Sequence, residues 1–412
     1  MAGKAKWTFM VYMAGDNNLS DTGEADLAEM RRVGSSEDVH IVAEFDNAGD
    51  RGTNRYYIKS GGRGEPVTAL GETDSGDPKV LVDFITWAAK EYPAERYALI
   101  LWNHGGGWEP SEIDRVARSL RPRDYSVREA SERSSSPMGK LLFRTSIECT
   151  FKHRSPRKRA ICSDDGSGHS LDTVELGNVL AQARKVLGQP VDILGLDACL
   201  MSNFEVAYQA QSYARYLVAS EESEPSDGWP YDRVLRRVVE SPHLSTADLA
   251  GHIVSDYVKS YASRKYSGPV TLSALDLSMI PRLTGPLDRL ADDLIARMPR
   301  ASREVFGAQK DSARFWHNTL WDISSFCEEL EKRTSNRAVR KAAQNVCAAV
   351  QPGPGKLVIS ALHAGKEFER CGGVSIYLIP PLTAISDYYK NLNFAKHHHW
   401  LSMLKAYHSS PI

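Results

Sequence analysis

Two stretches decide the fold: YALILW-NHGGGW at residues 97–108 and VDILGL-DACLM at residues 191–201. In each, a short apolar run that is typical of a buried strand ends directly in polar and glycine residues. Continuous apolar runs of this kind indicate parallel strands that are covered on both faces of their sheet. Because the carboxyl ends of neighbouring parallel strands meet at one edge, we expect His104 and Cys199 to face one crevice.

The same pattern extends in both directions along the chain. Further strands are predicted at 7–13, 39–46 and 216–220, with a short antiparallel one at 56–59. Helical spacing of apolar residues occurs at 19–33, 79–92, 176–187 and 203–212. Strands that alternate with amphipathic helices predict an α/β fold, a mostly parallel sheet flanked by helices on both faces. Ligands then bind at the loops after Trp102, Leu196 and Ser220.

The pattern changes near residue 245. Helices are predicted at 247–262, 287–298, 303–316, 336–350 and 388–407, with strand-like runs at 357–361 and 374–379. We therefore divide the chain into an α/β catalytic core at 1–244 and a mainly helical C-terminal region at 245–412 that packs on it.

The segment 109–159 interrupts the core. It has few apolar residues, several serines, and 13 Lys or Arg against 7 Asp or Glu. One interpretation is a solvated, flexible insertion. A basic arm for nucleic acid is a weaker one, because acidic residues are interleaved and aromatic residues are scarce.

Composition excludes several classes of protein. The 412 residues carry a formal net charge of −1, which gives no general attraction to nucleic acid or an anionic membrane. No apolar run approaches the roughly 20 residues of a membrane span. The six cysteines include no CxxC pair, so a zinc site of ordinary spacing is not expected. No secretory signal is visible at the N-terminus, and the predicted compartment is left as cytoplasmic or secreted.

A cysteine beside a histidine suits nucleophilic catalysis. A thiol of pKa about 8.5 is only a few per cent thiolate at neutral pH, and an imidazole can take its proton during attack. The N–H groups of Gly105 and Cys199 are the predicted donors to the oxyanion. Taken alone, a cysteine after a strand is more often a core residue. The HGGG run also matches lipases, but the chain has no GxSxG nucleophile motif.

The two motifs resemble those of the clostripain family of cysteine peptidases, whose fold is similar to that of caspases and gingipains. Other stretches look like the same family: MVYMAGDNNL at 10–19, SDD at 163–165, LDTVEL at 171–176, ASEE at 219–222, GWPY at 228–231 and GVSIY at 373–377. The similarity covers nearly the whole chain outside 109–159. It implies a caspase-like fold.

The resemblance also implies an endopeptidase that cleaves after Arg or Lys, with peptide or protein substrates. The acids expected in the pocket for that side chain match Asp197 and Asp227 here, and a carboxylate pairs well with a guanidinium. Trp229 is expected to form an apolar wall or to lie in the core. For two or three of the four acids in the loop 221–227 we favour a solvated position.

Family members are activated by cutting the chain between the histidine and the cysteine. We therefore expect self-cleavage at Arg159–Ala160, in a monomer that becomes a two-chain form. No cofactor is required for this chemistry. A calcium site would draw on Asp164, Asp165 and Asp172, but His169 stands where a small polar or acidic residue is expected, which argues against it.

Two other functions compete with the protease. The first is a caspase-like binding or regulatory module without catalysis. Loss of Cys199 or His104 would have favoured it, but both residues are present. A cysteine hydrolase acting on a small amide would use the same pair but would leave Arg and Lys peptides uncut.

Overall fold

Strand β1 (Ala5–Gly15) lies in the middle of the sheet, and its side chains alternate between two cores. The computed structural model describes residues 4–17, 19–49, 51–61, 66–108, 161–164, 167–263, 269–315, 319–381 and 383–410, and the predicted insertion at 109–159 lies outside them. Trp7 and Phe9 pack into one hydrophobic cluster, whereas Met10 and Tyr12 pack into the other. This period of two places a core on each face.

In the described part of the chain, the main sheet has nine strands in the order β11-β8-β7-β6-β5-β1-β2-β3-β4. The strands besides β1 are β2 (Val39–Asn47), β3 (Gly52–Tyr57), β4 (Thr68–Gly71), β5 (Ala94–Trp102), β6 (Val191–Asp197), β7 (Ala214–Ala219), β8 (Val270–Asp276) and β11 (Val358–Ala364). The five central strands are parallel, as predicted, and antiparallel strands close both edges.

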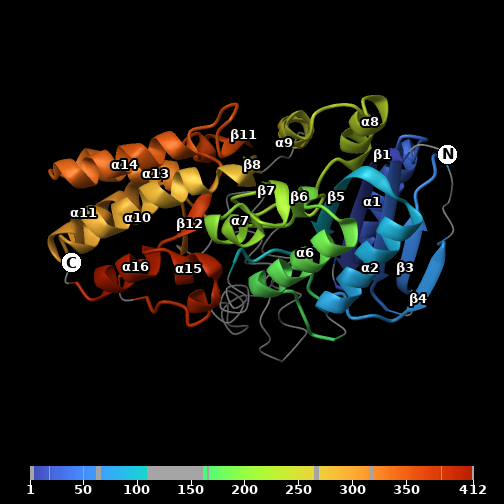
Figure 1. Ribbon diagram of the computed structural model, residues 1–412, viewed down its shortest axis with the longest axis horizontal. Helices are drawn as coiled ribbons and strands as arrows, with labels where there is room; N and C mark the ends of the chain where they lie inside the picture. Colours follow the sequence, from blue (N-terminus) through green and yellow to red (C-terminus); the bar gives the residue numbers. More distant parts are fainter. Residues whose placement is uncertain are drawn as a thin grey trace, which may run out of the picture.

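Helices cover both faces, which confirms the predicted layers. One face packs against α2 (Pro78–Glu91), α6 (Thr173–Leu187) and α7 (Phe204–Ala210), and the other against α1 (Ser20–Val33), α8 (Tyr231–Glu240) and α9 (Thr246–Ala262). Figure 1 shows α8 and α9 above the sheet and α2 and α6 below it. None of the helices described in the structure combines the length and apolar composition that a bilayer crossing requires.

The C-terminal helices stack beyond the β8 side of the sheet (Figure 1). They are α10 (Pro281–Ile295), α11 (Arg300–Asp311), α13 (Ile323–Arg333), α14 (Arg337–Val350), α15 (Asn393–His397) and α16 (Trp400–His408). A small antiparallel sheet joins β9 (Arg314–Phe315), β10 (Leu320–Asp322) and β12 (Ser375–Tyr377). Short 3-10 helices lie at Leu277–Met279, Lys366–Phe368 and Tyr389–Asn391.

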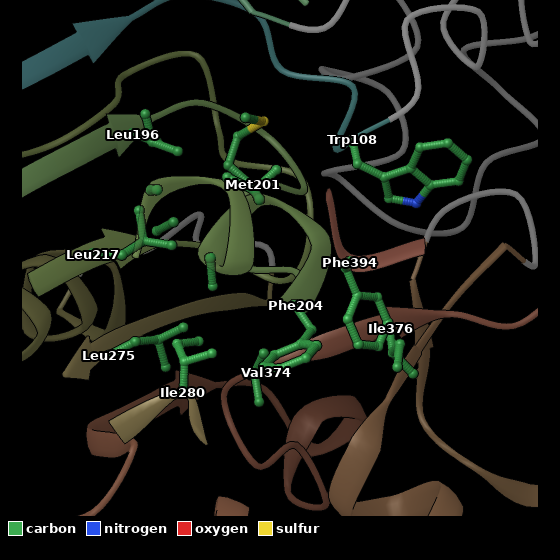
Figure 2. Close-up of a cluster of buried hydrophobic side chains, with 14 of the residues drawn as sticks. Trp108, Leu196, Met201, Phe204, Leu217, Leu275, Ile280, Val374, Ile376 and Phe394 are labelled. Carbon is green, nitrogen blue, oxygen red and sulfur yellow. The ribbon is translucent and has the colours of Figure 1, made fainter. Parts of the chain in front are cut away.

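One continuous core joins this region to the α/β part. Figure 2 shows Phe204 of α7 beside Phe394 and Ile376 of the C-terminal region. The N–H of Ser375 donates a hydrogen bond to the carbonyl of Ser202 at 3.0 Å. Because this contact follows the Cys199 turn, the C-terminal region supports the edge of the sheet that carries the cysteine.

Several elements differ from the predicted ones. Helices α8 and α13 were not predicted, and the helix predicted at 303–316 ends at Asp311, before β9. The predicted helix at 388–407 is broken at His398, whose extended backbone lets its ring bond to Asp288 and Tyr208. Strand β8 was not predicted, and together with β11 it places two strands from beyond residue 244 in the main sheet. The division of the chain at 244 stays a prediction.

Candidate active site

The predicted histidine and cysteine come from neighbouring strand ends. β5 pairs with β6 in parallel, with Trp102 opposite Asp197. His104 follows the first strand end by two residues, and Cys199 follows the second by two. The prediction that the two strands are neighbours is therefore confirmed.

A pocket opens at this edge, and both residues line it. The lining residues are Leu19, Trp102, Asn103, His104, Asp197, Ala198, Cys199, Glu224, Pro225, Ser226 and Gly228. They come from the loops after β5, β6 and β7, the three loops that the sequence predicts. Leu19, from the loop after β1, is an addition that the strand pattern did not indicate.

A strained turn carries Cys199. The next residue, Leu200, has a φ of 65°, a left-handed conformation that non-glycine residues rarely adopt. The N–H of Leu200 donates to the carbonyl of Glu222 at 3.2 Å, and its own carbonyl accepts from the Asn203 amide at 2.9 Å. Backbone strain held by surrounding hydrogen bonds is common at functional sites, and here it fixes the direction of the cysteine.

The Cys199 thiol is half-buried and held by the loop after β7. Its Sγ accepts a hydrogen bond from the N–H of Glu224 at 3.2 Å and donates to the carbonyl of the same residue at 3.7 Å. The N–H of Gly105 also faces the sulfur. Burial raises the pKa of the thiol to about 11, and the Glu222 carboxylate adds to the increase. In this conformation Cys199 is a thiol, not a thiolate.

Asp197 is fully engaged beneath the pocket. Its Oδ2 accepts hydrogen bonds from the N–H of Trp229 at 3.2 Å and from the hydroxyl of Tyr231 at 2.8 Å. Its carboxyl also contacts the carboxyl of Glu224, and burial raises the pKa of both acids. Because two buried carboxylates in contact repel, the pair holds a proton at neutral pH.

The structure places the other two predicted pocket residues elsewhere. Asp227 is exposed and is not among the residues that line the pocket. Trp229 is 1% exposed and packs into the core, where its ring would contact a Cβ on Gly195 at 2.9 Å. Trp229 was expected either to form an apolar wall of the pocket or to lie in the core, and it lies in the core.

Two of the four acids in this loop are buried, which leaves Glu222 and Asp227 for the solvated position that we favoured for two or three of them. Glu221 is 1% exposed and Glu224 is 5% exposed. The Glu221 carboxyl contacts that of Asp322 and accepts a hydrogen bond from the N–H of Gly373 at 3.0 Å. The C-terminal region thus provides a cover that the loop sequence alone does not reveal.

Comparison with known proteins shows the family of the chain. The sequence model of the clostripain family, peptidase family C11, matches residues 11–121 and 149–407. The chain belongs to the clostripain family. It is similar to clostripain from Hathewaya histolytica, with 28% identical residues over an alignment of 264 residues. The alignment covers 57% of this chain and 42% of that protein. The match thus spans less than half the length of that relative.

Solved structures of the clostripain family share the fold. A secreted C11 cysteine protease from Bacteroides thetaiotaomicron, in complex with an irreversible peptide inhibitor, superposes with a TM-score of 0.62 at 19% identity, covering 97% of this chain and 99% of that one. An inactive zymogen C11 protease from Parabacteroides distasonis superposes with a TM-score of 0.66 at 19% identity, covering 96% and 99%. The fold is therefore caspase-like, as predicted.

Two acids near the pocket carry no motif and were missed as site residues. Glu224 appeared only as one member of an acidic loop. Asp26 of α1 is 3% exposed, and its Oδ2 accepts a hydrogen bond from the Trp102 indole at 2.7 Å. Burial raises the pKa of Asp26 to about 9, and the nearby Asp197 contributes. An acid at an apolar position of the helical pattern is the signal that could have found it.

The described residues among those named for a calcium site are engaged in other contacts. The Asp164 carboxylate accepts hydrogen bonds from the N–H groups of Ser75 and Ser167, at 2.9 and 2.7 Å, and Asp172 caps α6. His169 pairs with Asp74. Asp165 lies outside the described residues. Among the residues that are described, no group of three or more His, Cys, Asp and Glu side chains is arranged to hold a metal ion.

The predicted cleavage site, Arg159–Ala160, also lies outside the described residues. The described chain resumes at Ile161, which exchanges backbone hydrogen bonds with Leu171 at 3.0 and 2.8 Å. Ile161 also forms a bridge with Gly105, the residue after His104. The chain after the predicted cut is therefore anchored beside the pocket.

Proposed function

We propose that this chain is a cysteine endopeptidase that cleaves after Arg or Lys, with Cys199 as nucleophile and His104 as its proton-transfer partner. The observation that carries the proposal is that both residues line one pocket, at the ends of two paired parallel strands, together with the buried carboxyl of Asp197. Membership of a peptidase family and a solved relative that holds a peptide inhibitor support it.

The chemistry follows from these groups. As Sγ attacks the peptide carbonyl, His104 takes the thiol proton. The carbonyl oxygen becomes an oxyanion, to which the N–H groups of Gly105 and Cys199 donate hydrogen bonds. The protonated imidazole then gives its proton to the leaving amine, and the thioester is hydrolysed by water with His104 again as base. A general base is needed because the raised pKa of Cys199 leaves little thiolate at neutral pH.

We infer that the substrate's P1 side chain, which precedes the cleaved bond, is drawn to the acidic floor of the pocket. Asp197 lies two residues before the nucleophile, at the end of β6. Asp227 is exposed in the same loop that provides Glu224 and adds negative charge to that loop. A guanidinium or ammonium group is the natural partner for such a pocket.

We further propose that the intact chain is a precursor that cuts itself at Arg159–Ala160. The raised pKa of Cys199 is consistent with a resting form, and an inactive zymogen is known among the solved relatives. The anchored position of Ile161 would leave the new end beside the pocket. The product is a monomer of two chains.

The test is release of a fluorophore from Arg- and Lys-peptide amides by the wild type, Cys199→Ala, His104→Ala and Cys347→Ala. Turnover should fall by on the order of 10⁴-fold or more in the first two variants. Cys347 lies in α14, away from the pocket, so its variant should match the wild type. A folded wild type without turnover would favour the binding module, and turnover of small amides alone would favour the small-amide hydrolase.

A further inference from the structure

Glu224 lies buried beside the pocket. Its side chain is 5% exposed and is one of the residues that line the cavity next to Cys199. Within the described residues, no N–H or O–H group donates a hydrogen bond of ordinary geometry to Oε1 or Oε2. The Trp229 indole lies close to the carboxyl without meeting that geometry. Because buried carboxyl oxygens are normally paired, this pocket lacks a donor.

Asp197 is in the opposite situation. Its Oδ2 already accepts from Trp229 and Tyr231, and Gly228 lies so close that a Cβ there would be 3.1 Å from both carboxyl oxygens. The remaining contact of Asp197 is with the Glu224 carboxyl. Asp197 is thus held by the protein, whereas the buried Glu224 oxygens accept no hydrogen bond of ordinary geometry within the described residues.

The surroundings of the pair are acidic. The titratable groups close to it are Asp26 of α1, Cys199 and His104 at the strand ends, Tyr231 of α8 and Tyr257 of α9. Asp227 acts on Asp26. The largest charge interactions of Asp26 and Glu224 are with Asp197, Glu29, Asp227 and Cys199, none of which is a cation. A cation supplied from outside therefore fits the unmet charge.

We propose that Glu224 is a specificity-determining residue of this site: its carboxylate receives the guanidinium or ammonium end of the substrate's P1 side chain, while Asp197 holds that carboxylate in place. The inference rests on the proposed function and deepens it. Before substrate enters, one proton lies between the two carboxyls. When the cation binds, that proton leaves to solvent and both carboxylates become ionised.

Kinetics with matched substrates tests this role. Peptide amides with Arg or its neutral isostere citrulline at P1 are compared by kcat/KM in the wild type and Glu224→Gln. The variant should lose on the order of 100-fold with the Arg substrate, because the ion pair is lost, and should change by less than about 3-fold with citrulline. Glu224→Asp should keep part of the preference. Glu222→Gln, which removes one charge from the same loop, should leave the Arg-to-citrulline ratio unchanged.

The pH profile of that ratio is the second readout. Titration of Cys199 and His104 acts on both substrates and cancels in the ratio. In the wild type the ratio should rise with pH as the shared proton is lost, and in Glu224→Gln the profile should be flatter. Equal ratios and equal profiles in the two proteins would overturn the proposal.

A binding measurement separates this inference from the proposed function. Calorimetry of acetyl-arginine amide with Cys199→Ala, in two buffers of different ionisation enthalpy, reports both affinity and released protons. Binding with proton release that is lost in Cys199→Ala/Glu224→Gln supports the role of Glu224 even if the wild type cleaves no peptide. Binding that is the same in both variants would contradict it, whatever the wild type cleaves.

Discussion

The backbone of Gly105 lies directly against the backbone of Cys199: a Cβ built on Gly105 would be 2.2 Å from the Cys199 carbonyl oxygen and 2.8 Å from its N. Neither atom can move without displacing the strained turn at Leu200. The glycine after His104 is therefore required for the two strand-end loops to meet.

Substitution of Gly105 by Ala should damage both stability and activity. Overpacking against backbone atoms should lower the free energy of unfolding by about 1–3 kcal/mol, and displacement of the N–H that faces Sγ should lower kcat by on the order of 10²-fold. Urea unfolding and peptide-amide kinetics measure the two effects. Gly251→Ala in α9 is the control, since a Cβ there meets only the Ser360 Cβ at 3.9 Å. Wild-type activity in Gly105→Ala would show that the loops can separate without harm.

Alkylation of Cys199 should depend steeply on pH in the intact chain. With a thiol pKa of about 11, the thiolate fraction at pH 7 is about 10⁻⁴ and increases tenfold per pH unit. The rate of iodoacetamide labelling at Cys199, followed by peptide mass spectrometry, should therefore rise about tenfold per unit between pH 7 and 10. A rate that is level from pH 6 to 8 would instead indicate a preformed thiolate–imidazolium pair.

Self-processing should depend on Arg159 and on the catalytic cysteine. Active wild type should yield fragments 1–159 and 160–412 on a denaturing gel, and N-terminal sequencing of the second should read Ala160-Ile161-Cys162. Arg159→Ala should slow this cut, and Cys199→Ala should stay intact until active enzyme is added. The neighbouring Arg157 and Lys158 are the expected alternative sites. A single chain after long incubation of active enzyme would contradict the activation step.

Stability should decrease as pH rises from about 4 through neutrality. Burial raises the pKa of Glu44, Asp46 and Glu205 to about 7 and that of Asp26 to about 9. Between about pH 4 and these values the folded chain holds protons that the unfolded chain has released, so the free energy of unfolding falls with pH. Each such group contributes a slope of up to about 1.4 kcal/mol per pH unit.

Urea unfolding at pH 5.5, 7 and 8.5 measures this slope. Asp26→Asn should flatten it, because the variant has no carboxyl to deprotonate at that position. The control is Asp387→Asn, whose side chain is fully exposed and should not affect the slope. Greater stability at pH 8.5 than at 5.5 would contradict the prediction.

The sequence determined the parallel strands, the layers and the meeting of His104 and Cys199 at one edge of the sheet. Strand ends can be located from local apolar runs, and the edge rule for parallel sheets then brings His104 and Cys199 together without knowledge of any distant contact. The antiparallel strand β8 could not be predicted in this way, since its partners β7 and β11 lie about fifty and ninety residues away in the sequence.

Only the tertiary structure decided the positions of the acids and of Trp229. An acid in a loop is solvated unless something covers it, and the cover over Glu221 comes from Asp322 and Gly373 of the C-terminal region. Trp229 lies in the core because Gly195 of β6 leaves room for its ring. Such burial depends on contacts between residues that are distant in the sequence, and local sequence patterns do not predict those contacts.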